Sequence, residues 1–231
     1  MLGPFNTGTN LLAKILKKNI EQNIQIHPEG HTLLWKHVIN KSLIEKDIQL
    51  NTDTLFICIY KPIHNWICSM QKASYNIQWN KTLTGKCDFK SERHNGILYR
   101  EQNYNNIIEI YNEYYNMYIE LINAHKRVIF MNYYDIIDKE NVVKYITNKL
   151  SVYNLFIRNN NNIISILHKP SKGHGKSVKS SNEAINKKTV GYNNINNCEK
   201  NKLIIKKHFN YEIIEFFELK KHFNYEIIES F

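Results

Sequence analysis

The chain has 231 residues, enough for one domain whose hydrophobic core needs no disulfides to hold it together. A hydrophobic share of 42%, with 15 tyrosines and 10 phenylalanines, indicates a folded protein. The formal charge of +10 favours anionic partners such as a nucleotide, a sulfated glycan, nucleic acid or a membrane surface. Nucleic-acid binding would rest on this charge alone, because no recognisable motif supports it.

No apolar run reaches the roughly 18 to 20 residues that span a bilayer, and no secretory leader is visible. The sequence therefore predicts a cytoplasmic protein without a membrane segment. The cysteines form no CxxC pair and no spacing typical of metal ligands, so they are predicted to be reduced thiols: Cys58, Cys68, Cys87 and Cys198.

The first half of the chain predicts a helix, a strand and a second helix. Apolar residues fall on one face of a helix over residues 11–18, and residues 23–35 are loop-like with a short strand around Leu33–Trp35. Thr54–Tyr60 is a short continuous apolar run between turn-forming residues, which is typical of a buried parallel strand. A helix over Asn65–Ser74 and a polar insert over residues 80–99 follow.

A second strand lies between two further helices. Tyr104–Ala124 is a long amphipathic helix, Arg127–Met131 is a buried strand, and Asp138–Leu150 has apolar residues at helical spacing. Strands that alternate with helices of this length predict an α/β domain, with a central parallel sheet in a three-layer αβα arrangement.

Such sheets bind ligands beyond the carboxyl ends of their strands. The loops that follow Leu2, Tyr60 and Met131 are therefore predicted to line one site.

From about residue 158 the composition changes. We expect residues 1–157 to form the α/β core, and residues 158–231 to add a mobile basic loop and a helical tail to the same domain. The loop is centred on Lys169–Ser181, which is rich in lysine, serine and glycine. In the tail, KKHFNYEIIE at Lys206–Glu215 recurs unchanged at Lys220–Glu229, which suggests a duplication that lengthens a terminal helix.

The segment GPFNTGTN, from Gly3 to Asn10, has the G-x-x-x-x-G frame of a phosphate loop directly before a helix. Nucleoside triphosphatases place a lysine and then a serine or threonine after the second glycine. Here these positions hold Thr9 and Asn10, so hydrolysis of a magnesium nucleotide is not favoured and no metal is expected. An ordinary turn, with Thr9 or Asn10 capping the helix, remains the alternative.

Two further segments complete a pattern. YKPIHNWICSM at Tyr60–Met70 places a cation at the end of a strand and a hydroxyl on the following helix, and NYYDII at Asn132–Ile137 follows the next strand. Together with the loop, where one extra residue follows the proline, these segments resemble the sulfotransferases that use 3′-phosphoadenosine 5′-phosphosulfate (PAPS). The resemblance covers roughly residues 1–150.

The resemblance implies a P-loop-like sulfotransferase fold and transfer of a sulfuryl group from PAPS, without a metal, to a hydroxyl or amine of a glycan or small molecule. It assigns Lys61 and Ser69 to the 3′-phosphate. It assigns the 5′-phosphosulfate to five residues of the loop: Asn6, Thr7, Gly8, Thr9 and Asn10.

The sequence departs from the family pattern at several points. Asn6 stands where the family has a lysine or arginine, Lys61 replaces an arginine, and only Met1 and Leu2 precede the loop where the family has its first strand. Two alternatives therefore stay open: a catalytically inactive member that binds only a nucleotide or polyanion, and a P-loop kinase.

Candidate catalytic residues follow the first helix. His37 is the predicted base, because an imidazole has a pKa near neutrality, and Lys36 is predicted to place its charge on the bridging oxygen or the sulfonate. His31 and Glu29 are alternative bases, and a surface role for His37 is the competing interpretation.

Overall fold

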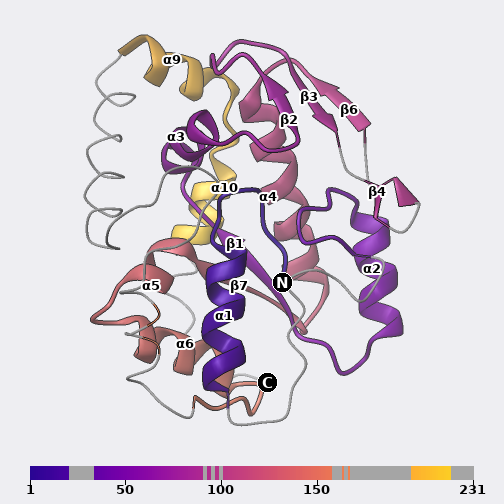
Figure 1. The fold of residues 1–231 in the computed structure, drawn as a ribbon, viewed down its shortest axis with the longest axis vertical. Helices are drawn as coiled ribbons and strands as arrows, with labels where there is room; N and C mark the ends of the chain where they lie inside the picture. The colour runs from indigo at the N-terminus through magenta and orange to yellow at the C-terminus, as the bar shows by residue number, and fades with distance from the viewer. Residues whose placement is uncertain are drawn as a thin grey trace.

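The computed structural model describes residues 1–20, 34–90, 93–94, 97–98, 101–157, 163, 166 and 199–219. The described part of the chain is mixed α/β, with a small parallel sheet surrounded by helices (Figure 1). The predicted α/β character is therefore confirmed. Within the described ranges, no helix is long and apolar enough to cross a bilayer.

The sheet consists of the two predicted strands. Strand β1 (Phe56–Tyr60) runs parallel to β7 (Val128–Asn132) in a five-residue register. Leu2 forms a parallel bridge with Cys58 on β1, so the segment that feeds the glycine-containing loop joins the same sheet through one residue. The strands and their parallel direction are confirmed.

Helices pack on both faces of this strand pair because successive strand residues point in opposite directions. Ile57 and Ile59 belong to one apolar cluster, which includes residues of α1 (Thr9–Asn19), α5 (Tyr133–Ile137) and α6 (Val142–Ser151). Phe56, Cys58 and Tyr60 belong to a second cluster, which includes residues of α3 (Ile63–Lys72) and α4 (Ile107–Ala124). All the helices predicted between residues 11 and 150 are present, with slightly different ends.

The segment between α1 and β1 differs from its prediction. Leu34 and Trp35 lie outside any strand and lead into a turn at Lys36 and His37, so the strand expected there is wrong over these two residues. Helix α2 (Lys41–Leu50) follows and was not predicted. Asn40 caps this helix, because its side chain accepts a hydrogen bond from Leu43 N at 3.1 Å.

The polar insert predicted over residues 80–99 belongs to a set of short antiparallel strands that begins at residue 77 and ends at residue 104. β2 (Ile77–Trp79), β3 (Cys87–Lys90) and β6 (Glu101–Tyr104) form one sheet in that order. A small hairpin, β4 (Arg93–His94) and β5 (Ile97–Leu98), lies between β3 and β6 in the chain. The insert forms a separate sheet beside α4 (Figure 1).

The described part of the tail packs against α4. It comprises α9 (Glu199–His208), α10 (Glu212–Ile214) and a π-helical turn, η1 (Glu215–Leu219). The first copy of the repeat is thus interrupted at Phe209 and Asn210 and is not one continuous helix. The basic loop predicted at 169–181 lies outside the described residues, as does the second copy.

Candidate functional site

Both glycines of the loop occupy positions where a side chain would not fit. Gly8 directly precedes α1 with φ at 85°, and an added Cβ would lie 3.0 Å from the ring of Tyr133. A Cβ on Gly3 would lie 2.5 Å from Thr7 Oγ1. The frame seen in the sequence therefore corresponds to a compact loop that only glycine allows at these two points.

Hydrogen bonds from three directions hold the loop. Thr7 Oγ1 donates to Pro4 O at 2.7 Å inside the loop. Trp66 Nε1, on α3, donates to Phe5 O at 2.8 Å, and Gly3 N donates to Lys36 O at 2.9 Å. The loop is therefore fixed against α3 and against the turn at Lys36 and His37.

The start of α1 offers backbone donors next to this loop. The first bond of the helix runs from Leu12 N to Gly8 O at 3.0 Å, so the N–H groups of Thr9, Asn10 and Leu11 have no acceptor within the helix. No side chain caps α1, which does not support the alternative of a simple capping turn. These N–H groups and the positive end of the helix dipole favour an anion.

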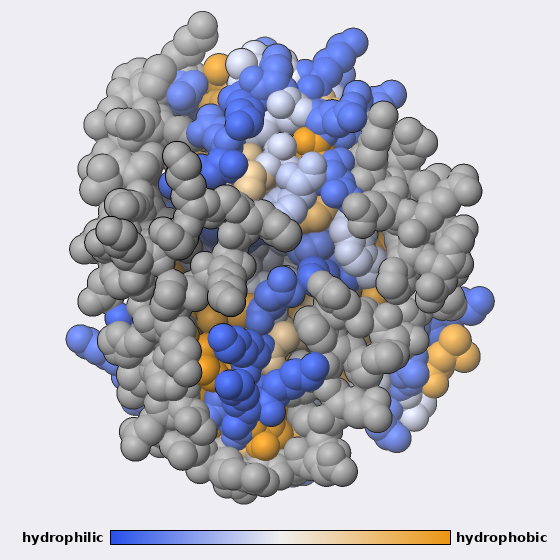
Figure 2. Space-filling model, viewed as in Figure 1, coloured by the Kyte–Doolittle hydropathy of each residue, from blue (hydrophilic) through white to orange (hydrophobic). Residues whose placement is uncertain are grey.

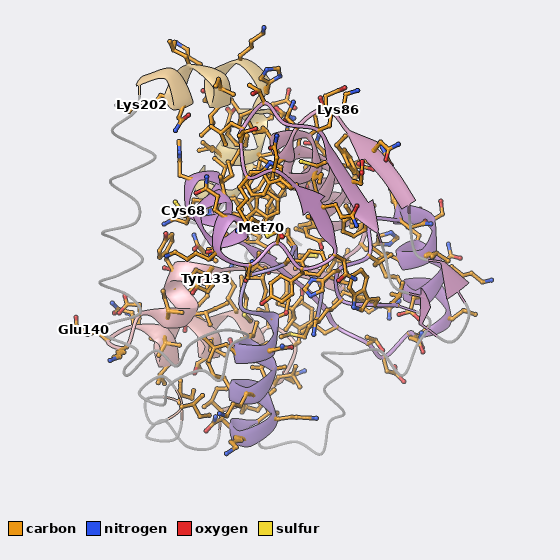
Figure 3. The ribbon with its side chains drawn as sticks, turned by 45° about the horizontal axis from the view of Figure 1, so that its top comes forward. Cys68, Met70, Lys86, Tyr133, Glu140 and Lys202 are labelled. Carbon is orange, nitrogen blue, oxygen red and sulfur yellow. The ribbon has the colours of Figure 1, made fainter. Side chains whose placement is uncertain are left out.

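Lys61 and Ser69 meet beside the loop. Lys61 Nζ donates to Ser69 Oγ at 2.8 Å and to Asn6 O at 2.9 Å, and lies 4.4 Å from the centre of the Tyr133 ring. Its side chain is almost fully buried, with 2% of the residue exposed. The segments after Leu2, Tyr60 and Asn132 therefore converge, as the parallel sheet predicted. Figure 3 shows Tyr133 at the start of α5, with Cys68 and Met70 on α3 across from it.

Two tyrosines of α4 fix the main chain at Lys61. Lys61 N donates to Tyr115 Oη at 3.0 Å, and the Tyr111 hydroxyl donates to Lys61 O at 2.9 Å. The Tyr115 hydroxyl also donates to Ile59 O at 3.2 Å. Burial raises the pKa of Tyr115 well above its ordinary value, so its hydroxyl stays protonated and can donate. Sequence reasoning treated these tyrosines only as part of an amphipathic helix.

The side chain of Asn6 turns away from the loop. Its Nδ2 donates to Ala73 O at 2.8 Å, at the carboxyl end of α3, while its main-chain oxygen accepts the bond from Lys61. Asn6 has φ at 63°, a conformation that asparagine tolerates better than most residues. Asn6 therefore links the loop to α3 and brings its backbone, not its side chain, toward Lys61.

Lys36 brings a second cation to the loop from the other side. Its Nζ donates to Asn10 Oδ1 at 3.0 Å, on the first turn of α1, and only 7% of the residue is exposed. Thus Lys36, which was predicted to place its charge on the bridging oxygen or the sulfonate, lies at the amino end of α1. Thr9 lies in the same turn, with its methyl group 3.0 Å from the position of a Cβ on Gly3.

His37 is enclosed beside the loop. Its Nδ1 lies 2.6 Å from Gly3 O, and its ring lies 4.2 Å from the Phe5 ring and 5.1 Å from the Trp35 ring, centre to centre. Since a carbonyl only accepts, Nδ1 carries the proton, and the neutral ring then has its lone pair on Nε2. Only 7% of His37 is exposed, so the competing interpretation of a surface histidine does not describe it. Its role as base stays a prediction.

Aromatic side chains form one wall near the loop. Tyr75 stacks on Phe5 with the rings 5.3 Å apart and nearly parallel, and it is 47% exposed. Phe89, from the insert, lies 6.0 Å from Phe5. The insert therefore reaches the loop.

Hydrophilic side chains gather over α1 on the face shown in Figure 2. The exposed positions of this helix include Lys14, Lys17 and Lys18. These lysines extend the positive charge along the helix that begins at the loop.

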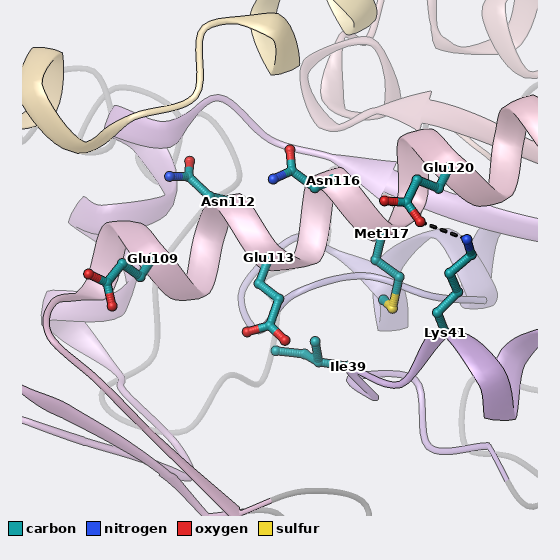
Figure 4. A pocket seen from close by; sticks show the side chains of 8 residues that line it. All are labelled: Ile39, Lys41, Glu109, Asn112, Glu113, Asn116, Met117 and Glu120. Carbon is teal, nitrogen blue, oxygen red and sulfur yellow. Dashed lines mark ion pairs between the residues drawn. The ribbon is translucent and has the colours of Figure 1, made fainter.

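A separate groove of about 430 Å³ lies along α4 and contains none of the predicted site residues (Figure 4). Its lining includes Glu109, Glu113 and Glu120, and Lys41 pairs with Glu120 at 2.7 Å. Among the residues that the structure describes, no three side chains of the His, Cys, Asp or Glu type gather as a metal site. The alternative bases His31 and Glu29 lie outside these residues.

Comparison with known proteins adds no relative. No protein-family model matches the chain, and no curated protein or solved structure is significantly similar to it.

Proposed function

We propose that the chain is a PAPS-dependent sulfotransferase with a three-layer, P-loop-like αβα fold. The observation that carries this proposal is the contact between Lys61 Nζ and Ser69 Oγ at 2.8 Å, with Asn6 O of the loop 2.9 Å from the same ammonium. The resemblance to the sulfotransferases assigns these two residues to the 3′-phosphate, and in the folded chain they lie together beside the loop.

The pair suits a phosphate because both groups donate hydrogen bonds. Two of the hydrogen bonds that the Lys61 ammonium donates go to neutral acceptors, the carbonyl of Asn6 and the hydroxyl of Ser69. A phosphate dianion is a stronger acceptor than either. Ser69 Oγ now donates to Asn65 O at 2.9 Å and would turn its proton to the same anion.

The loop and the start of α1 suit the 5′-phosphosulfate. The backbone N–H groups at Thr9, Asn10 and Leu11 are positioned to bind its oxygens, and Lys36 supplies a positive charge at the same turn. Such fixed donors stabilise negative charge that develops on a leaving phosphate. The donor supplies an activated sulfuryl group, whose transfer to a hydroxyl or amine requires no metal.

His37 is the proposed base for the acceptor. With Nδ1 bonded to Gly3 O, the ring is held in one tautomer and its Nε2 can accept a proton. The acceptor would approach past the aromatic wall of Phe5 and Tyr75, where the insert meets the loop.

One observation favours a second candidate, a binding protein of the same fold without transferase activity. The side chain of Asn6 bonds to α3 and does not reach across the loop, so the cation that the family places there is absent at that residue. The two candidates differ in whether Lys36 replaces this cation. No observation favours a P-loop kinase, for which a lysine would be needed at Thr9.

Calorimetric titration with 3′-phosphoadenosine 5′-phosphate (PAP), in buffer with a chelator, tests the shared part of both candidates. Saturable binding without magnesium is expected, and its absence would refute the enzyme and the nucleotide-binding form of the second candidate. Incubation with labelled PAPS and a panel of phenols, sugars and amines then separates them. Sulfated product supports the enzyme, and binding without any product supports the second candidate.

A further inference from the structure

Two asparagines of α4 hold the tail through hydrogen bonds to the tail's backbone and to one of its side chains. Asn112 donates to His208 O at 2.7 Å and accepts from Asn210 N at 3.1 Å, and Asn116 accepts from Asn210 Nδ2 at 3.0 Å. Asn112 and Asn116 both point from α4 toward the tail (Figure 4). α4 therefore contributes specific hydrogen bonds to a short segment centred on Asn210.

Three apolar side chains anchor the same segment. Phe209, Ile213 and Phe217 are 6%, 0% and 0% exposed. The Phe209 ring lies 5.7 Å from that of Tyr111, and the Phe217 ring stacks on Tyr60 at 4.5 Å. The tail-binding face therefore comprises these residues: Tyr60, Tyr111, Asn112, Tyr115, Asn116 and Phe130.

The four tail residues that anchor the segment each have an identical residue 14 positions later in the chain: Phe209, Asn210, Ile213 and Phe217. The repeat thus extends beyond its identical core, because Phe217 has its counterpart in the last residue. The matching residues are Phe223, Asn224, Ile227 and Phe231. Between residues 206 and 217, the only position that changes in the second copy is Phe216, which becomes Ser230.

We propose that the tail-binding face accepts either copy, so that residues 220–231 can replace residues 206–217 within the same chain. We call the state with residues 206–217 bound the first register and the state with residues 220–231 bound the second register. The hydrogen bonds to Asn112 and Asn116 and the three apolar anchors would be the same in both registers. The second register loses the Phe216 side chain, whose ring lies 6.4 Å from Phe130, and the docking of α9. The first register is therefore preferred, and the second is available when the first is weakened.

The exchange borders the candidate anion site. Phe217 packs on Tyr60, which directly precedes Lys61 in the chain. It also packs on Tyr115, whose hydroxyl accepts a hydrogen bond from Lys61 N. In the second register Phe231 takes this place. The exchange of the two copies does not depend on the proposed function, because it concerns only the tail and the tail-binding face.

Thermal unfolding of full-length variants tests the redundancy. Phe223→Ala is the matched control for Phe209→Ala, and both together remove the phenylalanine anchor from each register. We expect Phe223→Ala to leave Tm unchanged, and the double variant to lower it by roughly 10 °C, as for an uncompensated core truncation. Phe209→Ala alone should lower Tm by less than half as much. If Phe209→Ala equals the double variant, or does not fold, the proposal is wrong.

Cross-linking identifies which copy is bound. In a Cys198→Ser background, Asn116→Cys is combined with Asn210→Cys or with Asn224→Cys, each with and without Phe209→Ala. We expect the second pair to cross-link within one chain, and more completely when Phe209→Ala is present. The first pair serves as the positive control. Cross-linked dimers, or no product where the first pair gives one, would overturn the proposal.

Discussion

Replacing Lys61 by methionine should weaken ligand binding while leaving the fold intact. The ammonium is buried and bonds to Ser69 Oγ at 2.8 Å and Asn6 O at 2.9 Å. Methionine fills a similar volume without the charge, and such replacements of buried ionic groups are often neutral or stabilising. The Asn6 carbonyl loses its bond, at about 1–3 kcal/mol, so we expect a net change in the free energy of unfolding near zero.

The expected loss in affinity follows from the contact that the ligand would make. A hydrogen bond between a charged donor and a phosphate contributes about 1.5–3 kcal/mol. Lys61→Met should therefore weaken PAP binding by roughly 10- to 150-fold. Lys17→Met is the matched control, because Lys17 is exposed on α1 and its charge is screened by salt.

Calorimetry with PAP and urea unfolding of the same three proteins measure both quantities. Wild-type affinity in Lys61→Met would refute the assignment of Lys61 to the phosphate. Destabilisation by several kcal/mol with unchanged affinity would show that Lys61 serves the fold alone.

Three further predictions concern the loop and Lys149, a partly buried lysine on α6. Gly8→Ala should lower the free energy of unfolding by about 1–2 kcal/mol, because φ is 85° there, and unchanged urea unfolding would contradict the loop geometry. Trp66→Phe removes the donor to Phe5 O; a loss of about 1–3 kcal/mol and weaker PAP binding are expected, and unchanged values in both assays would show that the bond does not hold the loop. Burial lowers the pKa of Lys149 to about 8, so folding carries a cost while the unfolded lysine is charged. Lys149→Met should therefore stabilise the protein by roughly 1–3 kcal/mol at pH 7, and this gain should shrink as the pH rises from 8 to 10, whereas a gain that is constant with pH would contradict the assignment.

The sequence predicted the centre of the site because one rule of parallel sheets governs it. Carboxyl ends of parallel strands meet at one edge, so Lys61, the loop and Tyr133 had to come together once the strands were identified. The distance between Lys61 and Ser69 follows in turn from a short strand-to-helix connection. These features depend on local chain geometry, which periodicity in a sequence can reveal.

The rest of the site depends on tertiary packing that no local pattern records. Tyr111 and Tyr115 fit an amphipathic helix equally well whether or not they bond to Lys61. The enclosure of His37 comes from Phe5 and Trp35, which only the folded loop brings to it. The same holds for the insert, whose strands are short and are defined by their partners more than by their own residues.

The central claim, a site for a nucleotide with a 3′-phosphate, is tested most directly by comparing PAP with 5′-AMP in one calorimetric series. The two ligands differ only in the 3′-phosphate that Lys61 and Ser69 are proposed to bind. Two charged hydrogen bonds of about 1.5–3 kcal/mol each predict that PAP binds at least about 100-fold more tightly. Equal affinities for PAP and 5′-AMP would contradict the claim.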